Sequence, residues 1–199
     1  MPAERRSRAR ANADLHRLAR PRSAVTFRSI HLTDVERLDR MFRRCSPESL
    51  RLRFFAPMPT VPRSALLRLA VVDHRRDETV VALEGDEIVA IAGYSALPDA
   101  HELGSREAEL AVAVEDAWQR RGLGRVLARH LAAVARTRGC DAFRVRILPE
   151  NRPALRLLRD LVPDADVRFD DGEYAARLPL VRTGAVNPIE AESVVTPSR

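Results

Sequence analysis

Two glycines spaced by one residue, Gly122 and Gly124, separate an apolar run from an amphipathic helical pattern in "LAVAVEDAWQRRGLGRVLARHL", residues 110–131. Glycine inside a helix or strand costs about 0.5–1 kcal/mol relative to alanine, so a pair at this place needs a reason. One reason is a tight turn. The other is a backbone that approaches an anion, because the free N–H groups at a helix start bind negative charge.

Two phosphate-binding motifs that contain such glycines do not fit this stretch. A Walker A loop requires a lysine, and all 34 basic residues of the chain are arginine. A dinucleotide fingerprint requires a third glycine at the position of Leu127. The remaining pattern is Gln119-x-x-Gly122-x-Gly124 at a helix start. Hydrogen bonds to a charged group contribute about 1.5–3 kcal/mol each, so three or four amides there are sufficient to hold a pyrophosphate.

The order of the periodic segments predicts the fold class. A strand, a helix and a strand between residues 108 and 148 imply a right-handed crossover with parallel pairing. The two β-branched runs around Gly85-Asp86 predict an antiparallel hairpin. We therefore expect an α/β (α+β) fold with a mixed, twisted sheet flanked by helices. Expected helix starts are Thr33 as an N-cap, Ser46 before Pro47, and Asn151 as the cap of residues 150–162.

Length and charge suggest one domain with two tails. The 199 residues fit a domain over 25–181, a basic arm over 1–24 and a polar tail over 182–199. Residues 1–22 hold seven arginines against Glu4 and Asp14, so five of the six formal positive charges lie there. The near-neutral remainder argues against nucleic-acid binding by the folded part.

The same composition argues against three other classes of protein. No apolar run approaches the roughly 18–20 residues of a membrane span, and no apolar segment of a signal peptide follows the arginine-rich start. Cys45 and Cys140 are far apart and lie in no Cys/His cluster, which predicts neither a disulfide framework nor a metal site. We expect a cytoplasmic protein, with its oligomeric state open and a homodimer compatible with the sequence.

The glycine stretch resembles the central motif of the GNAT superfamily of N-acetyltransferases, which bind acetyl-CoA through a Q/R-x-x-G-x-G/A loop. The resemblance covers roughly residues 25–180 and includes the downstream "LPENRPALRLL". The segments "SPESLRLRFFAP" and "VVDHRRDETVVAL" are similar to the branch of bacterial protein-lysine acetyltransferases. The resemblance implies a mostly antiparallel acyl-CoA N-acyltransferase fold, acetyl-CoA as cosubstrate, no metal, and an amine acceptor that is a small molecule or a protein lysine.

The resemblance also implies positions for the cofactor. It places the strand backbone of Val112, Ala113 and Val114 beside the pantetheine arm, and Asn151 near that arm, where an N-cap role is compatible with it. The pyrophosphate would be held by the amides of six consecutive residues, Arg120, Arg121, Gly122, Leu123, Gly124 and Arg125.

Acetyl transfer to an amine needs a base. An alkylammonium with a pKa of about 10.4 costs about 4.6 kcal/mol to deprotonate at pH 7, and a carboxylate acting directly or through water is the usual solution. Glu109 is our candidate because it shares a strand face with the small residues Ala111 and Ala113. Glu107, Glu115 and Asp116 are weaker candidates.

One position departs from the family pattern. Many members carry a tyrosine seven residues after the asparagine, as an acid for the departing thiolate, and this chain has Leu158 there. Tyr94 and Tyr174 are possible substitutes, although core positions suit them better. Two functions follow: an acetyl-CoA-dependent N-acetyltransferase, or an acyl-CoA-binding regulatory module that uses its arginine-rich arm on an acidic partner.

Overall fold

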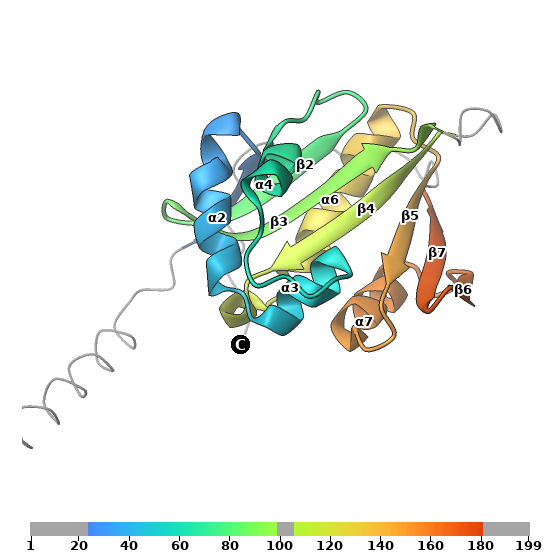
Figure 1. The fold of residues 1–199 in the computed structure, drawn as a ribbon. Coiled ribbons are helices and arrows are strands. Elements are labelled where there is room, and N and C mark those ends of the chain that lie inside the picture. The colour runs from blue at the N-terminus through green and yellow to red at the C-terminus, as the bar shows by residue number, and fades with distance from the viewer. Residues whose placement is uncertain (1–23, 99–105, 181–199) are drawn as a thin grey trace, which may run out of the picture.

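The computed structural model describes residues 24–98 and 106–180, in which one seven-stranded sheet has the order β1-β2-β3-β4-β5-β7-β6 (Figure 1). The expected C-terminal tail, and the N-terminal arm apart from residue 24, lie outside these residues. The strands are β1 Val25–Ser29, β2 Glu78–Glu84, β3 Glu87–Ala96, β4 Glu107–Val114, β5 Ala142–Ile147, β6 Val167–Asp170 and β7 Glu173–Pro179. Only β4 and β5 pair in parallel, so the expected mixed, mostly antiparallel sheet is confirmed.

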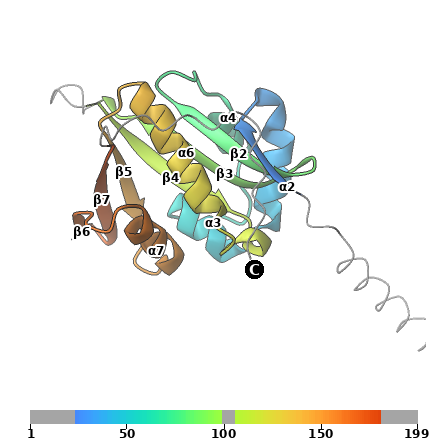
Figure 2. The same cartoon turned by 180° about the vertical axis from the view of Figure 1, so that it is seen from behind.

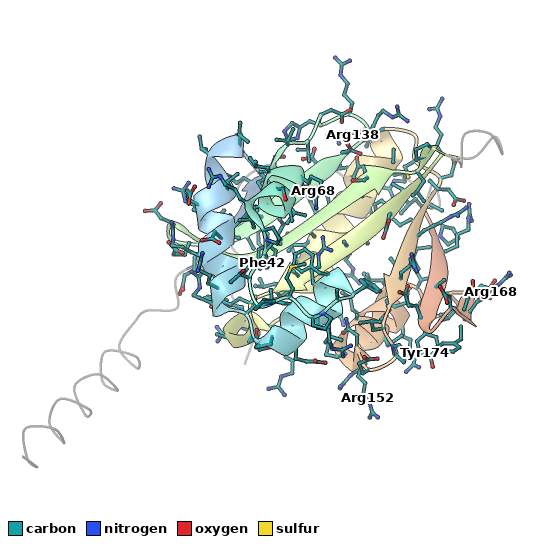
Figure 3. All side chains as sticks on the ribbon, viewed as in Figure 1. Phe42, Arg68, Arg138, Arg152, Arg168 and Tyr174 are labelled. Carbon is teal, nitrogen blue, oxygen red and sulfur yellow. The ribbon has the colours of Figure 1, made fainter. Side chains whose placement is uncertain are left out.

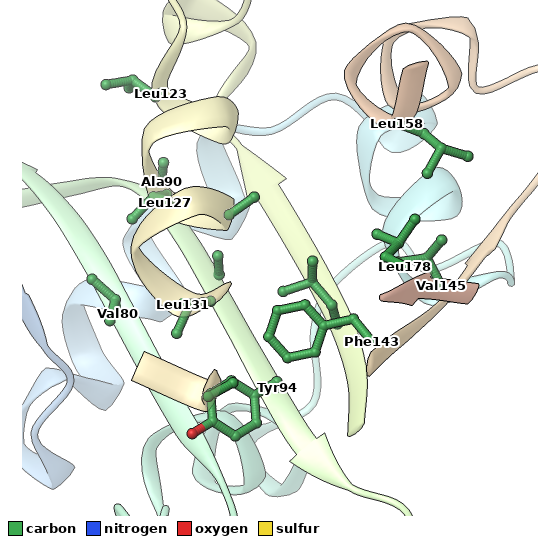
Figure 4. Close-up of a cluster of buried hydrophobic side chains, with 14 of the residues drawn as sticks. Val80, Ala90, Tyr94, Leu123, Leu127, Leu131, Phe143, Val145, Leu158 and Leu178 are labelled. Carbon is green, nitrogen blue, oxygen red and sulfur yellow. The ribbon is translucent and has the colours of Figure 1, made fainter. Parts of the chain in front are cut away.

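Helices cover both faces of the sheet. The helices are α2 Val35–Arg44, α3 Pro47–Phe54, α4 Arg63–Ala70, α6 Leu123–Thr137 and α7 Arg152–Leu161, with short 3-10 turns at Leu32–Asp34 and Asp116–Trp118. Figures 1 and 2 show α2, α3 and α4 on one face and α6 on the other. On the α6 face, Leu127 and Leu131 are fully buried against strand residues such as Val80 and Ala90 (Figure 4). Each face of the sheet thus has its own apolar core.

The parallel pair β4–β5 is short. Its register covers only Glu107↔Ala142, Ala108↔Phe143 and Glu109↔Arg144. Strand β4 continues for five more residues, to Val114, while β5 turns away from it toward β7. Figure 1 shows the two strands spreading apart, with α3 and α7 on either side of the opening. The sheet is therefore split along the carboxyl half of β4.

The first helical segment starts differently from the sequence prediction. Thr33 is not the N-cap: it lies inside the 3-10 turn Leu32–Asp34, and the Asp34 carboxylate accepts from the His31 amide at 2.9 Å. Asp34 also accepts from Arg28 at 2.6 and 2.8 Å and from Arg37 at 3.1 Å. A carboxylate that bonds two arginines fixes the β1–α2 corner more firmly than a threonine hydroxyl would.

Asp34 gives a pH-dependent contribution to stability. It is fully buried, and the hydrogen bonds from Arg28 are the largest of the effects that lower its pKa from 3.8 to about 2. A lowered carboxyl pKa stabilises the fold above the unfolded-state pKa, and that contribution is lost as the pH falls through the folded value. We expect Asp34→Asn to lower the free energy of unfolding by about 2 kcal/mol at pH 7. Urea titrations should show the difference from wild type shrinking between about pH 4 and pH 2. A difference that is constant over that range would contradict the ionic origin.

Candidate active site

A cleft of about 250 Å³ opens where β4 and β5 separate. Both strands contribute to its walls, and helices α3 and α7 complete them. The lining includes Arg53, Phe55, Glu109, Ala111, Val112, Val145, Asn151 and Leu158. The walls are largely apolar, with few charged groups, which is the usual composition of a small-molecule site.

The loop between β4 and α6 presents unused backbone donors. Within the described residues, the amides of residues 120–124 donate to no acceptor, whereas the Arg125 amide donates to the Gly122 carbonyl at 3.0 Å. Five of the six amides expected from the sequence are therefore free, and the Arg125 amide belongs to the helix. Gly122 has φ +83° and Arg120 has φ +58°, so the chain is left-handed at both. Alternation of this kind gathers successive N–H groups into a concave anion site.

The two glycines of the loop have different roles. Gly122 has open space around its Cα, so its left-handed backbone, which costs other L-residues roughly 1–2 kcal/mol, is the reason for glycine. At Gly124 an added Cβ would lie 3.4 Å from Leu157 and 3.6 Å from Val112, which are ordinary contact distances. The packing of α6 against β4 and α7 therefore does not require a glycine at position 124, and alanine would fit there.

Side chains hold the loop in place from α3. The side-chain amide nitrogen of Gln119 donates to the Val114 carbonyl at 3.2 Å and to the Ser49 hydroxyl at 3.1 Å. The Asp116 carboxylate accepts from the Ser46 amide at 2.9 Å and from the hydroxyls of Ser46 and Ser49 at 2.7 and 3.0 Å. Ser46 also caps α3, as the sequence predicted. The link from Ser46 to Asp116 was not predictable from the sequence, because the residues are about seventy positions apart.

The arginines of the loop fall into two groups. The Arg125 guanidinium forms an ion pair with Asp160 of α7. The Arg121 guanidinium lies 4.5 Å from the centre of the Trp118 ring. Among the described residues, neither Arg120 nor Arg121 has a carboxylate within ion-pair distance. The loop therefore combines free amides with uncompensated positive charge, which favours an anionic ligand.

Glu109 lies in the cleft. It is exposed on the strand face of Ala111 and Ala113, where small side chains leave room beside it. The weaker candidates have structural partners. Glu107 is buried and bound by Arg144 and by Arg177, the latter at 2.7 Å. Glu115 is bound by Arg44 at 2.9 Å, and Asp116 by the serines of α3.

Asn151 and Leu158 both lie on the α7 wall of the cleft. The Asn151 Oδ1 accepts from the Ala154 amide at 3.1 Å, so the predicted cap is present and the side chain also borders the cleft. Leu158 is buried and has no polar group to offer a thiolate. Tyr94 does not replace it: its hydroxyl accepts from Arg138 at 2.8 Å and its ring packs on Phe143 in the core. Tyr174 packs edge-on against Phe169, and neither tyrosine lines the cleft.

Residues 24–98 and 106–180 contain neither a metal cluster nor a membrane-spanning helix. No group of three or more His, Cys, Asp and Glu side chains there is arranged to hold a metal ion. No helix in those ranges is both long and apolar enough to cross a bilayer.

Comparisons with known proteins agree with this geometry. The sequence model of the acetyltransferase (GNAT) family matches residues 36–161. A curated acetyltransferase of Pseudomonas aeruginosa is 32% identical over 141 residues, which are 69% of this chain and 71% of the relative. The crystal structure of the GNAT domain of S. lividans PAT is 31% identical, has a TM-score of 0.69, and is covered over 89% of its length by 77% of this chain.

Together with the geometry of the site, these similarities define the class of protein. It is an acyltransferase fold in which β4 and β5 separate and the loop after β4 has free backbone amides. The chain belongs to the GNAT family of acetyltransferases, so the resemblance noted in the sequence is confirmed. A structure of yncA from Salmonella typhimurium with acetyl-CoA shares the fold at 20% identity, with a TM-score of 0.64, and is covered over 98% of its length by 82% of this chain.

Proposed function

We propose that this protein transfers an acetyl group from acetyl-CoA to a primary amine, which is a small molecule or a lysine of another protein. The observation that carries the proposal is the position of the free amides of residues 120–124 next to the β4–β5 cleft: a Cβ at Gly124 would lie 3.4 Å from Leu157 and 3.6 Å from Val112, and both of these residues line the cleft. An extended thiol-bearing chain with a pyrophosphate at one end matches such a site in shape and charge. The acetyl-CoA named in the yncA structure supports the same cosubstrate.

The chain's own groups would act at two ends of the cleft. At the loop, the amides of residues 120–124 would bind the pyrophosphate, and the backbone of Val112, Ala113 and Val114 would pair with the pantetheine arm where β5 leaves the edge of β4 free. Asn151, which lines the opposite wall, would border the same arm. At the other end, Glu109 lies at the last paired position of β4 and β5 and is exposed in the cleft lining, where it would meet the acceptor.

The reaction proceeds by direct attack. The neutral amine nitrogen forms a bond to the thioester carbonyl carbon, the C–S bond breaks, and the electron pair leaves on sulfur. Glu109, directly or through water, takes the proton that the nitrogen loses. With Leu158 on the α7 wall, the thiolate takes its proton from water, which a thiol pKa of about 8.5 permits.

The composition of the chain limits which acceptors are possible. The chain contains no lysine, so any lysine that it acetylates belongs to a different protein. The alternative is a module that binds acyl-CoA without transferring it, and the specific observation in its favour is the apolar Leu158 in place of an acid.

Release of CoA in the presence of candidate amines tests the proposal. A thiol reagent reports the product, and the protein's own thiols give little background because burial raises the pKa of Cys140 and raises that of Cys45 to about 12. We expect acetyl-CoA to raise the melting temperature and at least one amine in the panel to accelerate CoA release. Stabilisation without any amine-dependent release would favour the binding module. Absence of stabilisation would overturn both functions.

A further inference from the structure

The cleft lining includes an arginine that has no ion-pair partner among the described residues. Arg53, near the end of α3, is partly buried and lines the cleft together with Glu109. A guanidinium has five N–H donors. Among the described residues none of them donates a hydrogen bond and no carboxylate lies within ion-pair distance of Arg53. Its close contact is with the neighbouring Phe54 ring, whose centre is 5.1 Å from the guanidinium carbon.

The other arginine of the same helix shows that α3 does not lack acidic partners. Arg51 forms ion pairs with Glu48 at 3.0 Å and with Glu150 at 2.6 Å. Arg53, two residues later, points to the cleft instead. Burial lowers the pKa of the Arg53 guanidinium, and the charge of Glu109 acts in the opposite direction. Arg53 is thus a partly exposed cation in the cleft lining whose donors have no acceptor among the described residues.

A ligand that fills the cleft displaces water from the Arg53 guanidinium, so a ligand that supplies the opposite charge is favoured over a neutral one. A guanidinium binds planar, singly charged carboxylates through two parallel hydrogen bonds. A phosphate would bring nearly two negative charges next to the carboxylate of Glu109, which disfavours it. The third charged residue of the lining, Arg146, already pairs with Glu173 at 2.6 Å.

We propose that Arg53 binds a carboxylate that one of the two substrates brings into the cleft, so that the enzyme selects a carboxylate-bearing acceptor amine or a carboxylate-bearing acyl group. This inference rests on the proposed function and specifies its substrate class. Arg53 is then a specificity-determining residue, and Glu109 beside it remains free to accept the proton of the amine.

Matched pairs of substrates separate the two sources of the carboxylate. In the acceptor arm, β-alanine is compared with β-alaninamide, with acetyl-CoA as donor. In the acyl arm, succinyl-CoA is compared with butyryl-CoA, with one neutral amine as acceptor. For one arm we expect wild type to favour the carboxylate-bearing member, and Arg53→Gln to lower its kcat/KM by about 10–100-fold, the range of one or two charged hydrogen bonds. The neutral member should change by less than about threefold.

Two further variants serve as controls. One tests whether the forked shape of the Arg53 guanidinium matters beyond its charge, and the other tests whether the loss of any arginine has the same effect. Arg53→Lys keeps the charge without the fork and should retain part of the preference. Arg68→Gln removes an exposed arginine of α4, from the layer of helices that also holds α3 (Figure 3). It should leave the ratio of kcat/KM values within each of the two substrate pairs unchanged. Melting temperatures of all variants establish that each is folded.

The outcomes distinguish this inference from the proposed function. Acetyl transfer with no carboxylate preference in either arm, or an equal loss for both members of each pair in Arg53→Gln, would overturn the inference and leave the transferase intact. If acetyl-CoA binds but no amine is acetylated, the inference about Arg53 is tested instead by measuring the affinities of these ligands with titration calorimetry. Wild type should then bind succinyl-CoA more tightly than butyryl-CoA, or N-acetyl-β-alanine more tightly than its amide in the presence of CoA. Equal affinities within both pairs would overturn the inference.

Discussion

Glu109→Gln is expected to lower kcat for acetyl transfer by about 10²–10⁴-fold, the usual contribution of a general base. Glutamine keeps the size of the side chain in the cleft and removes the proton acceptor. The amides of residues 120–124 are unaffected, so the affinity for acetyl-CoA should stay within about threefold, since no contact to the loop is removed. Initial rates of CoA release and calorimetric titration of acetyl-CoA measure the two quantities separately.

Glu84→Gln is the matched control for this variant. Glu84 ends strand β2, is partly exposed, has no ion pair among the described residues, and lies outside the cleft lining. We expect it to keep the wild-type kcat. A Glu109→Gln protein with wild-type kcat would show that the amine loses its proton to water or to another group, and the assignment of Glu109 would be wrong.

The elements that carry local signals were predictable from the sequence. The hairpin of β2 and β3 follows from β-branched runs around Gly85-Asp86, and the turn glycine has φ +57°. The caps Ser46 and Asn151 were found because a serine or asparagine before a proline-containing first turn is a short-range pattern. The parallel pairing of β4 with β5 followed from the crossover rule.

Features that depend on distant residues were not predictable. The sequence does not show that β5 leaves β4 after Glu109, because β5 instead pairs along its whole length with β7, which lies later in the chain, and no local pattern marks that pairing. The position of Arg53 in the same cleft as Glu109 depends on α3 packing against β4, more than fifty residues away. The prediction of Thr33 as a cap was wrong because the Asp34 carboxylate holds this corner instead. Arg28 of β1 binds that carboxylate, and no local pattern shows this contact.

Gly122→Asp is expected to weaken acetyl-CoA binding by about 30–100-fold with the fold retained. The new carboxylate would lie among the free amides of residues 120–124 and repel the pyrophosphate. Two unit charges about 4 Å apart interact by about 4 kcal/mol at an effective dielectric constant of 20, and solvent at this exposed loop reduces that to about 2–3 kcal/mol. Aspartate tolerates the left-handed backbone of Gly122 better than most residues, and no atom obstructs its Cβ.

Gly122→Asn separates charge from shape in this test. It has the same size and a similar tolerance of positive φ, so both variants should lose a similar, small amount of stability. If the amides bind an anion, the asparagine variant should bind acetyl-CoA much more tightly than the aspartate variant, and high salt should narrow the gap by screening. Equal dissociation constants for the two variants would mean that the loop does not hold the negatively charged part of the cosubstrate. Calorimetric titrations of both variants at low and high ionic strength therefore decide whether the free amides of this loop are an anion site or only the start of α6.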